Sequence, residues 1–222
     1  MRVYVVVEGH SEERLAQQLL TPHLAARGVW LYPMRVPVGG GGRGGGSRWA
    51  HWDRFLRRLL REQTSSVVRV TTLLDLYAIP EDTPGYTAPR PRAGAARADR
   101  MLAAMEASIG DSRFLPYIQV HELEALLFVD LGVVADVVGS LSGRRALLRL
   151  AQDVAGVGAE EVNDGPLSAP SKRIFQCLPD FRKTLQGIDA LERIGLPRLR
   201  AGCPRFGAWV DRLEGFAESS SV

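Results

Sequence analysis

The sequence predicts an α/β fold, in which a mostly parallel sheet is flanked by helices and followed by a helical C-terminal half. Strand and helix patterns alternate as far as Val120, which is typical of parallel βαβ units. The first strand pattern, over residues 2–8, is a nearly continuous β-branched run, as expected where both faces of a strand are buried. From Ala125 onward the patterns are helical or loop. We therefore expect an α/β core over residues 1–128 and a helical region over residues 129–222 that packs on it.

Four apolar runs predict the strands. They cover residues 2–8, 29–38, 67–74 and 114–120. Pro33 and Pro37 in the second run favour an edge position, because proline cannot donate a hydrogen bond to a neighbouring strand. The sequence therefore predicts a sheet with the second strand at its edge.

Helices are expected between these strands and after the last of them. Ser11 is a suitable N-cap for the first helix, and Gly28 a suitable residue just beyond its end. A second helix begins near Trp49 with an apolar stripe at helical spacing, and a third covers residues 97–109. In the C-terminal half, helical patterns cover residues 125–138, 144–154, 171–178, 189–194 and 204–216.

Arginines gather on a glycine-rich loop and on the helix that follows it. The loop, Gly39–Ser47, lacks the Gly-Lys-Ser/Thr sequence of a P-loop. Trp49 and Trp52 on the helix are expected in the core rather than as a surface on which bases stack. The arginines on the loop and on the opposite helix face suit contacts with nucleic-acid phosphates, with a merely solvated surface as the alternative. These candidate residues are Arg43, Arg48, Arg54 and Arg58.

The composition excludes several classes of protein. Of 222 residues, 45% are hydrophobic and 24% charged, which is the composition of a globular domain and not of a disordered chain. No apolar run approaches the ~20 residues of a membrane span, and the N-terminus lacks the features of a signal peptide. Cys177 and Cys203 lie far apart, so we expect a cytoplasmic protein with no structural zinc site.

Acidic residues end three of the four expected strands. Glu8 ends the first strand, Asp75 the third, and the fourth runs into Glu122 and Glu124. Because the carboxyl ends of parallel strands meet at one edge of a sheet, these side chains would repel one another unless a cation neutralised them. Carboxylate oxygens favour Mg²⁺ or Mn²⁺. Glu12 could reach the same ion, or it could simply stabilise the N-terminus of its helix. The alternative for each strand-end acid is a cap on the turn or helix that follows.

The backbone at Glu122 and Glu124 decides whether both side chains reach the site. In a continuing strand they would point the same way. In a helix they would diverge by about 200°, and only one would reach the site. The two nearby histidines have simpler expected roles: His10 is expected to be solvent-exposed, and His121 to form a structural hydrogen bond rather than to bind a metal.

Short motifs along nearly the whole chain carry a family resemblance. Glu8-Gly9-His10-Ser11-Glu12 is similar to the first motif of Toprim domains, and Asp75 lies where those domains carry an Asp-x-Asp sequence. Further motifs are Glu122-Leu123-Glu124, Asn163-Asp164, Pro170-Ser171-Lys172 and Cys203-Pro204-Arg205-Phe206. In order and spacing they resemble a Toprim-like family of unknown function, domain-of-unknown-function family 4276. The resemblance implies a Toprim-like fold.

By analogy with the overcoming-lysogenization-defect (OLD) nucleases, the resemblance implies metal-dependent cleavage of DNA or RNA. The expected metal ligands are Glu8, Glu12, Asp75, Glu122 and Glu124. The expected catalytic residues are Glu8, Asp75, Glu122 and Lys172. Lys172 would stabilise charge on the phosphate, and Ser171 is expected as an N-cap that aims the helix N-terminus at the same anion. Lys172 and Lys183 are the only lysines in the chain, and Lys183 is left outside the catalytic set.

The resemblance also implies a partner and an alternative function. Such families often work beside an ABC- or AAA-type ATPase encoded nearby, in phage defence or repair; no membrane partner is expected, and homo-oligomerisation stays open. Tyr77 replaces the second Asp of Asp-x-Asp, so one ligand is missing unless Asp82, Glu122 or Glu124 takes its place. This departure favours the alternative, a non-catalytic Toprim-like subunit that binds nucleic acid or nucleotide and regulates an ATPase.

Overall fold

A parallel sheet forms the centre of the computed structural model, which describes residues 1–37, 48–77, 79–88, 94–162 and 168–217. Within these residues the strand order is β2-β1-β3-β4, with β5 also pairing with β3, and every pairing is parallel. The strands are β1 (Arg2–Val7), β2 (Trp30–Arg35), β3 (Val68–Asp75), β4 (Phe114–Leu115) and β5 (Ile118–Gln119). The predicted α/β class, the parallel sheet and the edge position of β2 are confirmed.

The last expected strand is divided into β4 and β5 because Pro116 interrupts it. The side chain of Thr72 on β3 fills the gap in the ladder. Its hydroxyl accepts a hydrogen bond from the backbone N–H of Tyr117 and donates one to the Tyr117 carbonyl, each at 2.9 Å. These bonds satisfy backbone groups that a continuous strand would have paired directly.

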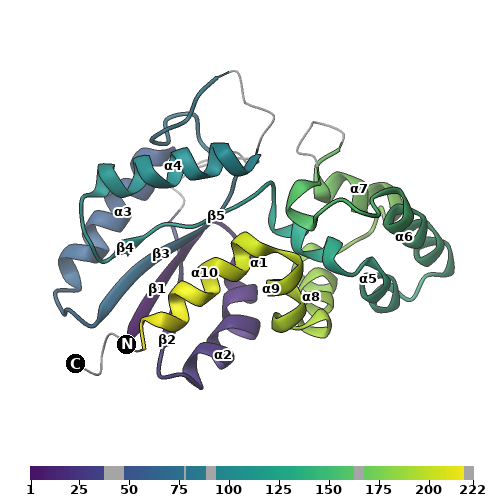
Figure 1. Ribbon diagram of the computed structural model, residues 1–222, viewed down its shortest axis with the longest axis horizontal. Coiled ribbons are helices and arrows are strands. Elements are labelled where there is room, and N and C mark those ends of the chain that lie inside the picture. Colours follow the sequence, from purple (N-terminus) through teal and green to yellow (C-terminus); the bar gives the residue numbers. More distant parts are fainter. Residues whose placement is uncertain (38–47, 78, 89–93, 163–167, 218–222) are drawn as a thin grey trace.

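Two layers of helices cover the sheet. One face carries α3 (Trp49–Glu62) and α4 (Gly94–Ile109), and the other carries the first helical segment of the chain together with α10 (Pro204–Gly215) (Figure 1). The first helical segment consists of α1 (His10–Leu15), a π-helical stretch η1 (Ala16–Leu20) and α2 (Thr21–Ala25). It begins one residue before Ser11. The expected Ser11 cap is therefore wrong: Gly9 is the N-cap residue, and its N–H donates to the Glu12 carboxylate at 3.0 Å.

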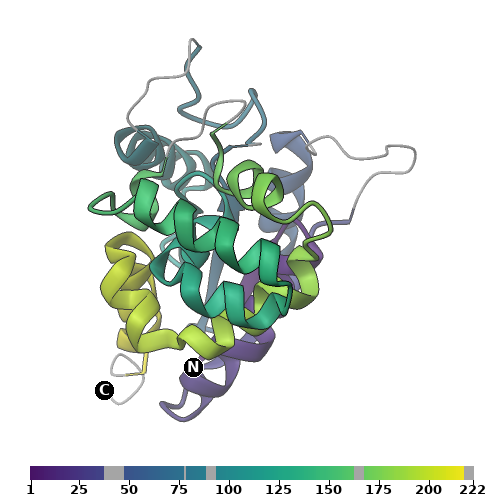
Figure 2. The same ribbon diagram turned by 90° about the vertical axis from the view of Figure 1, so that its right-hand side faces the viewer.

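The C-terminal half of the chain is helical, as expected, and several of its helices lie beyond the carboxyl ends of the strands (Figures 1 and 2). Its segments are the 3₁₀ helix η2 (Leu123–Val129), α5 (Leu131–Val138), α6 (Leu141–Asp153), η3 (Ala159–Glu161), α7 (Pro170–Cys177), the π-helical stretch η4 (Lys183–Gly187), α8 (Ile188–Ile194) and α9 (Leu196–Gly202). The helix expected from Ala125 is thus a 3₁₀ helix followed by α5, and α9 was not expected. No helix within the described residues has the length and apolar character that crossing a bilayer requires.

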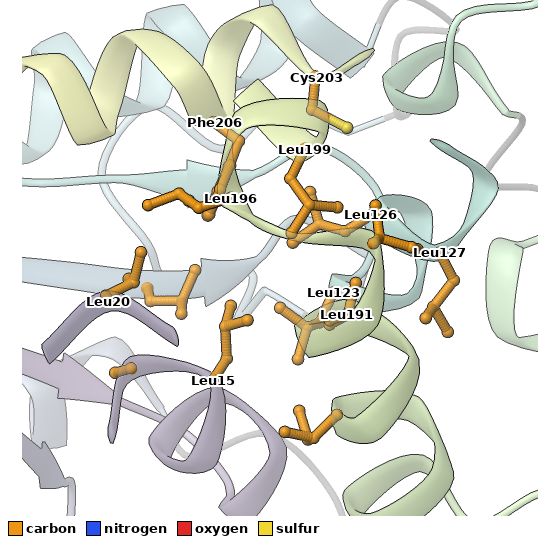
Figure 3. Packing of buried hydrophobic residues seen from close by; sticks show 14 of the residues in the cluster. Leu15, Leu20, Leu123, Leu126, Leu127, Leu191, Leu196, Leu199, Cys203 and Phe206 are labelled. Carbon is orange, nitrogen blue, oxygen red and sulfur yellow. The ribbon is translucent and has the colours of Figure 1, made fainter. Parts of the chain in front are cut away.

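Two hydrophobic clusters hold the layers together. The cluster beneath α3 and α4 includes Trp49 and Trp52, only 6% and 1% exposed, so their expected place in the core is confirmed. The second cluster joins Leu15 of α1 to Leu126 of η2 and Leu199 of α9 (Figure 3). It contains residues from both sides of the boundary expected at residue 128, so both regions bury apolar surface against each other. The division into two domains stays a prediction.

Candidate acidic site at the carboxyl edge of the sheet

The sheet places Glu8 and Asp75 on neighbouring strands. Strands β1 and β3 are parallel, and Val7 pairs with Leu73. Glu8 follows the last residue of β1, and Asp75 is the last residue of β3, so both lie at the carboxyl edge of the sheet. Adjacent parallel strands are about 4.8 Å apart, which brings the two backbones close together at this edge.

Asp75 is the acid on which all the others of this cluster act. One oxygen of its half-buried carboxylate accepts a hydrogen bond from the backbone N–H of Leu123 at 2.9 Å. Burial raises the pKa of Asp75 well above its usual value, and the negative charges of Glu12, Glu124, Glu122 and Glu8 raise it further. The five expected metal ligands therefore lie close enough together to act on one another electrostatically.

Glu8 and Glu12 form the side of the cluster nearest α1. Glu8 is at the surface, but partial desolvation still raises its pKa. Desolvation also raises the pKa of Glu12, and the charge of Glu8 adds to the increase. The Glu12 carboxylate closes over Gly9, where a Cβ atom would lie only 2.8 Å from the Glu12 oxygen. A side chain at position 9 would therefore force Glu12 to move.

Glu122 is held by the N-terminus of α7. Its backbone is extended, with φ −143° and ψ 162°, and its side chain is buried. The two carboxylate oxygens accept hydrogen bonds from the Ser171 backbone N–H at 2.9 Å and from the Ser171 hydroxyl at 3.0 Å. Ser171 lies inside the first turn and Ala169 is the N-cap, so the expected N-cap role of Ser171 is wrong. Among the described contacts, the anion at this helix N-terminus is Glu122 itself.

Glu124 points to a different partner, because Leu123 begins the 3₁₀ helix and turns the chain away from the extended Glu122. The buried Glu124 carboxylate forms an ion pair with Lys183 of η4, with 3.1 Å between the oxygen and Nζ. Desolvation raises the pKa of Glu124 although Lys183 opposes the increase. Partial burial would lower the pKa of Lys183, but the charges of Glu124, Glu122 and Asp75 outweigh this effect and raise it.

Lys183 is thus the lysine that the structure brings into contact with the acidic cluster. The expected lysine, Lys172, is exposed on α7, and no ion pair joins it to the cluster within the described residues. Lys183 was not expected in the catalytic set, because no strand end adjoins it in the sequence. Its only signal was the rarity of lysine in this arginine-rich chain.

The backbone just before Glu122 adopts a conformation that is rare for residues other than glycine. His121 has φ 65° and its side chain is buried. Its carbonyl accepts a hydrogen bond from the Tyr77 backbone N–H at 2.8 Å, which ties the end of β3 to the start of the Glu122 segment. Such conformations persist where surrounding contacts impose them, and they cluster at functional sites. His10, in contrast, is exposed as expected, and its ring lies 3.0 Å from an Arg35 nitrogen.

Asp82, one of the residues considered as a substitute for the missing Asp, has another role. Its carboxylate accepts hydrogen bonds from the backbone N–H groups of Trp49 at 2.9 Å and Ala50 at 3.5 Å. It therefore caps the N-terminus of α3 from a distant part of the chain. The acids that raise the pKa of Asp75 most are Glu12, Glu124, Glu122 and Glu8, and not Asp82.

The donor set suits a hard divalent cation, but it is not a closed metal site. Within the described residues, no three histidine, cysteine, aspartate or glutamate side chains are arranged to hold a metal ion together. Mg²⁺ usually keeps several waters and needs only one or two carboxylates as direct ligands. Five carboxylates share the single positive charge of Lys183 in this cluster, and the remaining negative charge around Asp75 fits a hydrated Mg²⁺ or Mn²⁺ ion, with other acids contacting its waters.

The expected nucleic-acid-binding arginines lie on a separate surface. Arg54 and Arg58 are exposed on α3, and Arg48 is exposed at its N-cap. The Arg58 guanidinium lies over the Phe55 ring at 5.4 Å. Arg43 and the loop Gly39–Ser47 lie outside the residues that the structure describes. Nucleic-acid binding by these arginines stays a prediction.

Comparisons with known proteins agree with the fold. The C-terminal region of the Burkholderia pseudomallei OLD protein is similar in structure, with a TM-score of 0.51, 18% identity and coverage of 100% of this chain and 98% of that chain. The corresponding region of the Xanthomonas campestris pv. campestris OLD protein gives 0.46 and 13%, over 99% and 98%. No protein with a curated description matches. The expected relation to the OLD fold is confirmed.

A family model also matches the sequence. It covers residues 7–214 and is described as "Domain of unknown function (DUF4276)". The match includes every acid of the cluster as well as Ser171 and Lys183. It therefore spans β2 to β5 and the helices that hold the carboxylates, and it begins at the last residue of β1. The chain belongs to the DUF4276 family.

Proposed function

We propose that this protein is a metal-dependent nuclease of Toprim type that hydrolyses phosphodiester bonds of DNA or RNA. The observation that carries the proposal is that Glu8, Glu12, Glu122 and Glu124 gather around Asp75 at the carboxyl edge of the sheet, where burial and their charges raise its pKa. Charge repulsion of this kind costs stability unless a cation relieves it. The position of the cluster, at the carboxyl ends of parallel strands, is where α/β folds bind their ligands.

In this proposal Glu8, Glu12, Asp75, Glu122 and Glu124 hold Mg²⁺ or Mn²⁺. When bound, the ion would polarise the phosphate and lower the pKa of a water molecule. Lys183 approaches the cluster through Glu124 and provides a positive charge beside the phosphate. The Ser171 hydroxyl orients Glu122, since both of its carboxylate oxygens are engaged. Lys172 at the surface of α7 would bind substrate further from the reacting phosphate.

We further propose that the protein acts in the cytoplasm as the nuclease subunit of a two-component phage-defence or repair system. A separate ABC- or AAA-type ATPase would supply nucleotide hydrolysis. The support for this part is the resemblance to OLD nucleases, together with the matching fold of the OLD C-terminal region.

A non-catalytic subunit is the second candidate, and Tyr77 favours it. Tyr77 stands where Toprim domains carry their second Asp, and Asp82 is committed to the α3 N-terminus. A subunit of this kind would bind nucleic acid or nucleotide and regulate the ATPase without cleaving anything.

Magnesium- or manganese-dependent cleavage tests the proposal. Plasmid DNA, single-stranded DNA and RNA are incubated with the purified protein while each cation is titrated, and Asp75→Asn is compared with the control Asp82→Asn. We expect cation-dependent cleavage that Asp75→Asn abolishes and Asp82→Asn retains. Absence of cleavage with the wild type, alone and with its ATPase, would favour the regulatory subunit. Equal activity in both variants would remove Asp75 from the mechanism.

A further inference from the structure

Two aromatic side chains are exposed on the edge strand of the sheet. Trp30 is 55% exposed and Tyr32 is 45% exposed. Side chains two residues apart in a strand point to the same face, so both lie on the face that α3 and α4 cover elsewhere. On the adjacent strand, Tyr4 continues the patch, with 5.4 Å between the ring centroids of Tyr4 and Tyr32.

The open edge of β2 is poorly suited to pairing with another strand. The N–H groups of Trp30 and Val36 donate inward to carbonyls of the first strand region, at 2.8 and 3.1 Å. Odd-numbered residues between them therefore direct their nitrogens outward, and Pro33 has no N–H to offer there. Pairing with an added strand is therefore disfavoured at this edge. The exposed rings are better explained as a surface on the face of the sheet to which a ligand binds.

A small basic cavity continues this surface beyond the end of β2. It has a volume of about 230 Å³ and is lined by Val36, Pro37, His51, Arg54, Phe55 and Arg58. Its lining combines apolar side chains with the guanidinium groups of Arg54 and Arg58, and the Arg58 group lies over the Phe55 ring. A second source of positive charge lies at the start of β2, where the exposed Arg2 of β1 is directly opposite Trp30.

The direction of β2 connects this surface with the acidic cluster. Strands β1 and β2 are parallel, and Arg35 at the end of β2 is level with Val7. The residue that follows β1 is Glu8 of the acidic cluster. A flexible chain lying along β2 would thus pass from Trp30 over Tyr32 towards the sheet edge where the acids gather.

We propose that Trp30, Tyr32 and the cavity beside α3 form a binding track for single-stranded nucleic acid. The bases would stack on the rings, and Arg2, Arg54 and Arg58 would contact the phosphates. Unpaired bases present free faces to aromatic side chains, whereas bases in a duplex are stacked on one another. The track rests on the proposed nuclease function, because it would deliver a single strand to the acidic site.

The intrinsic fluorescence of Trp30 gives a direct measure of binding. The other tryptophans, Trp49, Trp52 and Trp209, are only 6%, 1% and 3% exposed, so acrylamide quenches mainly Trp30. The Asp75→Asn protein is titrated, without divalent cations, with single-stranded DNA and RNA oligonucleotides of about 15 nucleotides and with a duplex of the same length. We expect single strands to quench the emission and to protect Trp30 from acrylamide, and the duplex to bind more weakly.

Three variants test the contact itself. Trp30→Ala and Tyr32→Ser are each expected to weaken single-strand binding about 5- to 150-fold, the range for loss of one stacked base. Leu141→Ala is the control: it removes an apolar side chain on α6 that is 77% exposed, and it should leave the affinity unchanged. Thermal unfolding verifies that each variant is folded.

The outcomes separate this proposal from the proposed nuclease function. Equal affinity for duplex and single strand, or unchanged affinity in both Trp30→Ala and Tyr32→Ser, would overturn the track even if cleavage occurs. Tight single-strand binding that needs Trp30, in a protein that cleaves nothing, would support the track and contradict the nuclease.

Discussion

Replacement of Ser171 by alanine tests how firmly the C-terminal helices hold the acidic edge of the sheet. The Ser171 hydroxyl donates to a Glu122 oxygen at 3.0 Å, and both residues are buried, at 4% and 7% exposure. The substitution removes this bond and leaves the second one, from the Ser171 backbone N–H at 2.9 Å. Glu122 therefore keeps one partner, and water has little access to replace the other.

The expected loss is about 2 kcal/mol in the free energy of unfolding, because hydrogen bonds to charged groups contribute roughly 1.5–3 kcal/mol. Alanine is also a good helix former, so the backbone of α7 should be unaffected. For a domain of this size, a loss of about 2 kcal/mol corresponds to a fall of roughly 4–8 °C in Tm.

Urea unfolding followed by circular dichroism measures this loss. Ser168→Ala is the matched control, since Ser168 lies just before α7 and its side chain forms no hydrogen bond among the described contacts. A loss below about 0.5 kcal/mol for Ser171→Ala, or one equal to that of the control, would refute the anchoring of Glu122 by α7.

Three other predictions concern the same structure. Because the pKa of Asp75 is raised by burial and neighbouring acids, the folded state binds its proton more tightly than the unfolded state, and the free energy of unfolding should fall as pH rises above about 4. Asp75→Asn should flatten this fall in metal-free urea titrations, and an unchanged slope would contradict the electrostatic account. Asp82→Ala should cost about 1 kcal/mol by uncapping α3, measured in the same way against a Glu62→Ala control. Gly207→Ala should destabilise α10 by about 1–3 kcal/mol because its Cβ would lie 2.8 Å from the Arg200 carbonyl, whereas Gly215→Ala, with open space, should not.

The sequence predicted most of the sheet because its signals are local. Apolar runs and helical periodicity reflect burial of each segment, and they located β1, β3, α3 and α4 to within a few residues. Pro33 located the edge strand, since a missing N–H is tolerated only there. The acids at strand ends followed from the same pattern, because parallel strands bring their carboxyl ends together.

The rest depends on contacts between distant residues. The division of the last strand depends on Thr72 and Pro116 together, and neither residue alone predicts it. Ser11 and Ser171 resembled N-caps in sequence, but Gly9 and Ala169 hold those positions because Glu12 and Glu122 bind the free N–H groups. The pairing of Lys183 with Glu124 depends on the π-helical stretch η4 and cannot be predicted from the sequence.

The anchoring of Glu122 and Glu124 has a consequence for synthesis on the ribosome. The strands and their acids are made first, but Ser171 follows Glu122 by 49 residues, and Lys183 comes later still. At elongation rates of about 5–20 residues per second, the acidic edge lacks both partners for roughly 2–10 s. A nascent chain therefore carries an unbalanced negative edge until Ser171 and Lys183 have emerged, so the site is completed only after the sheet that carries most of its acids.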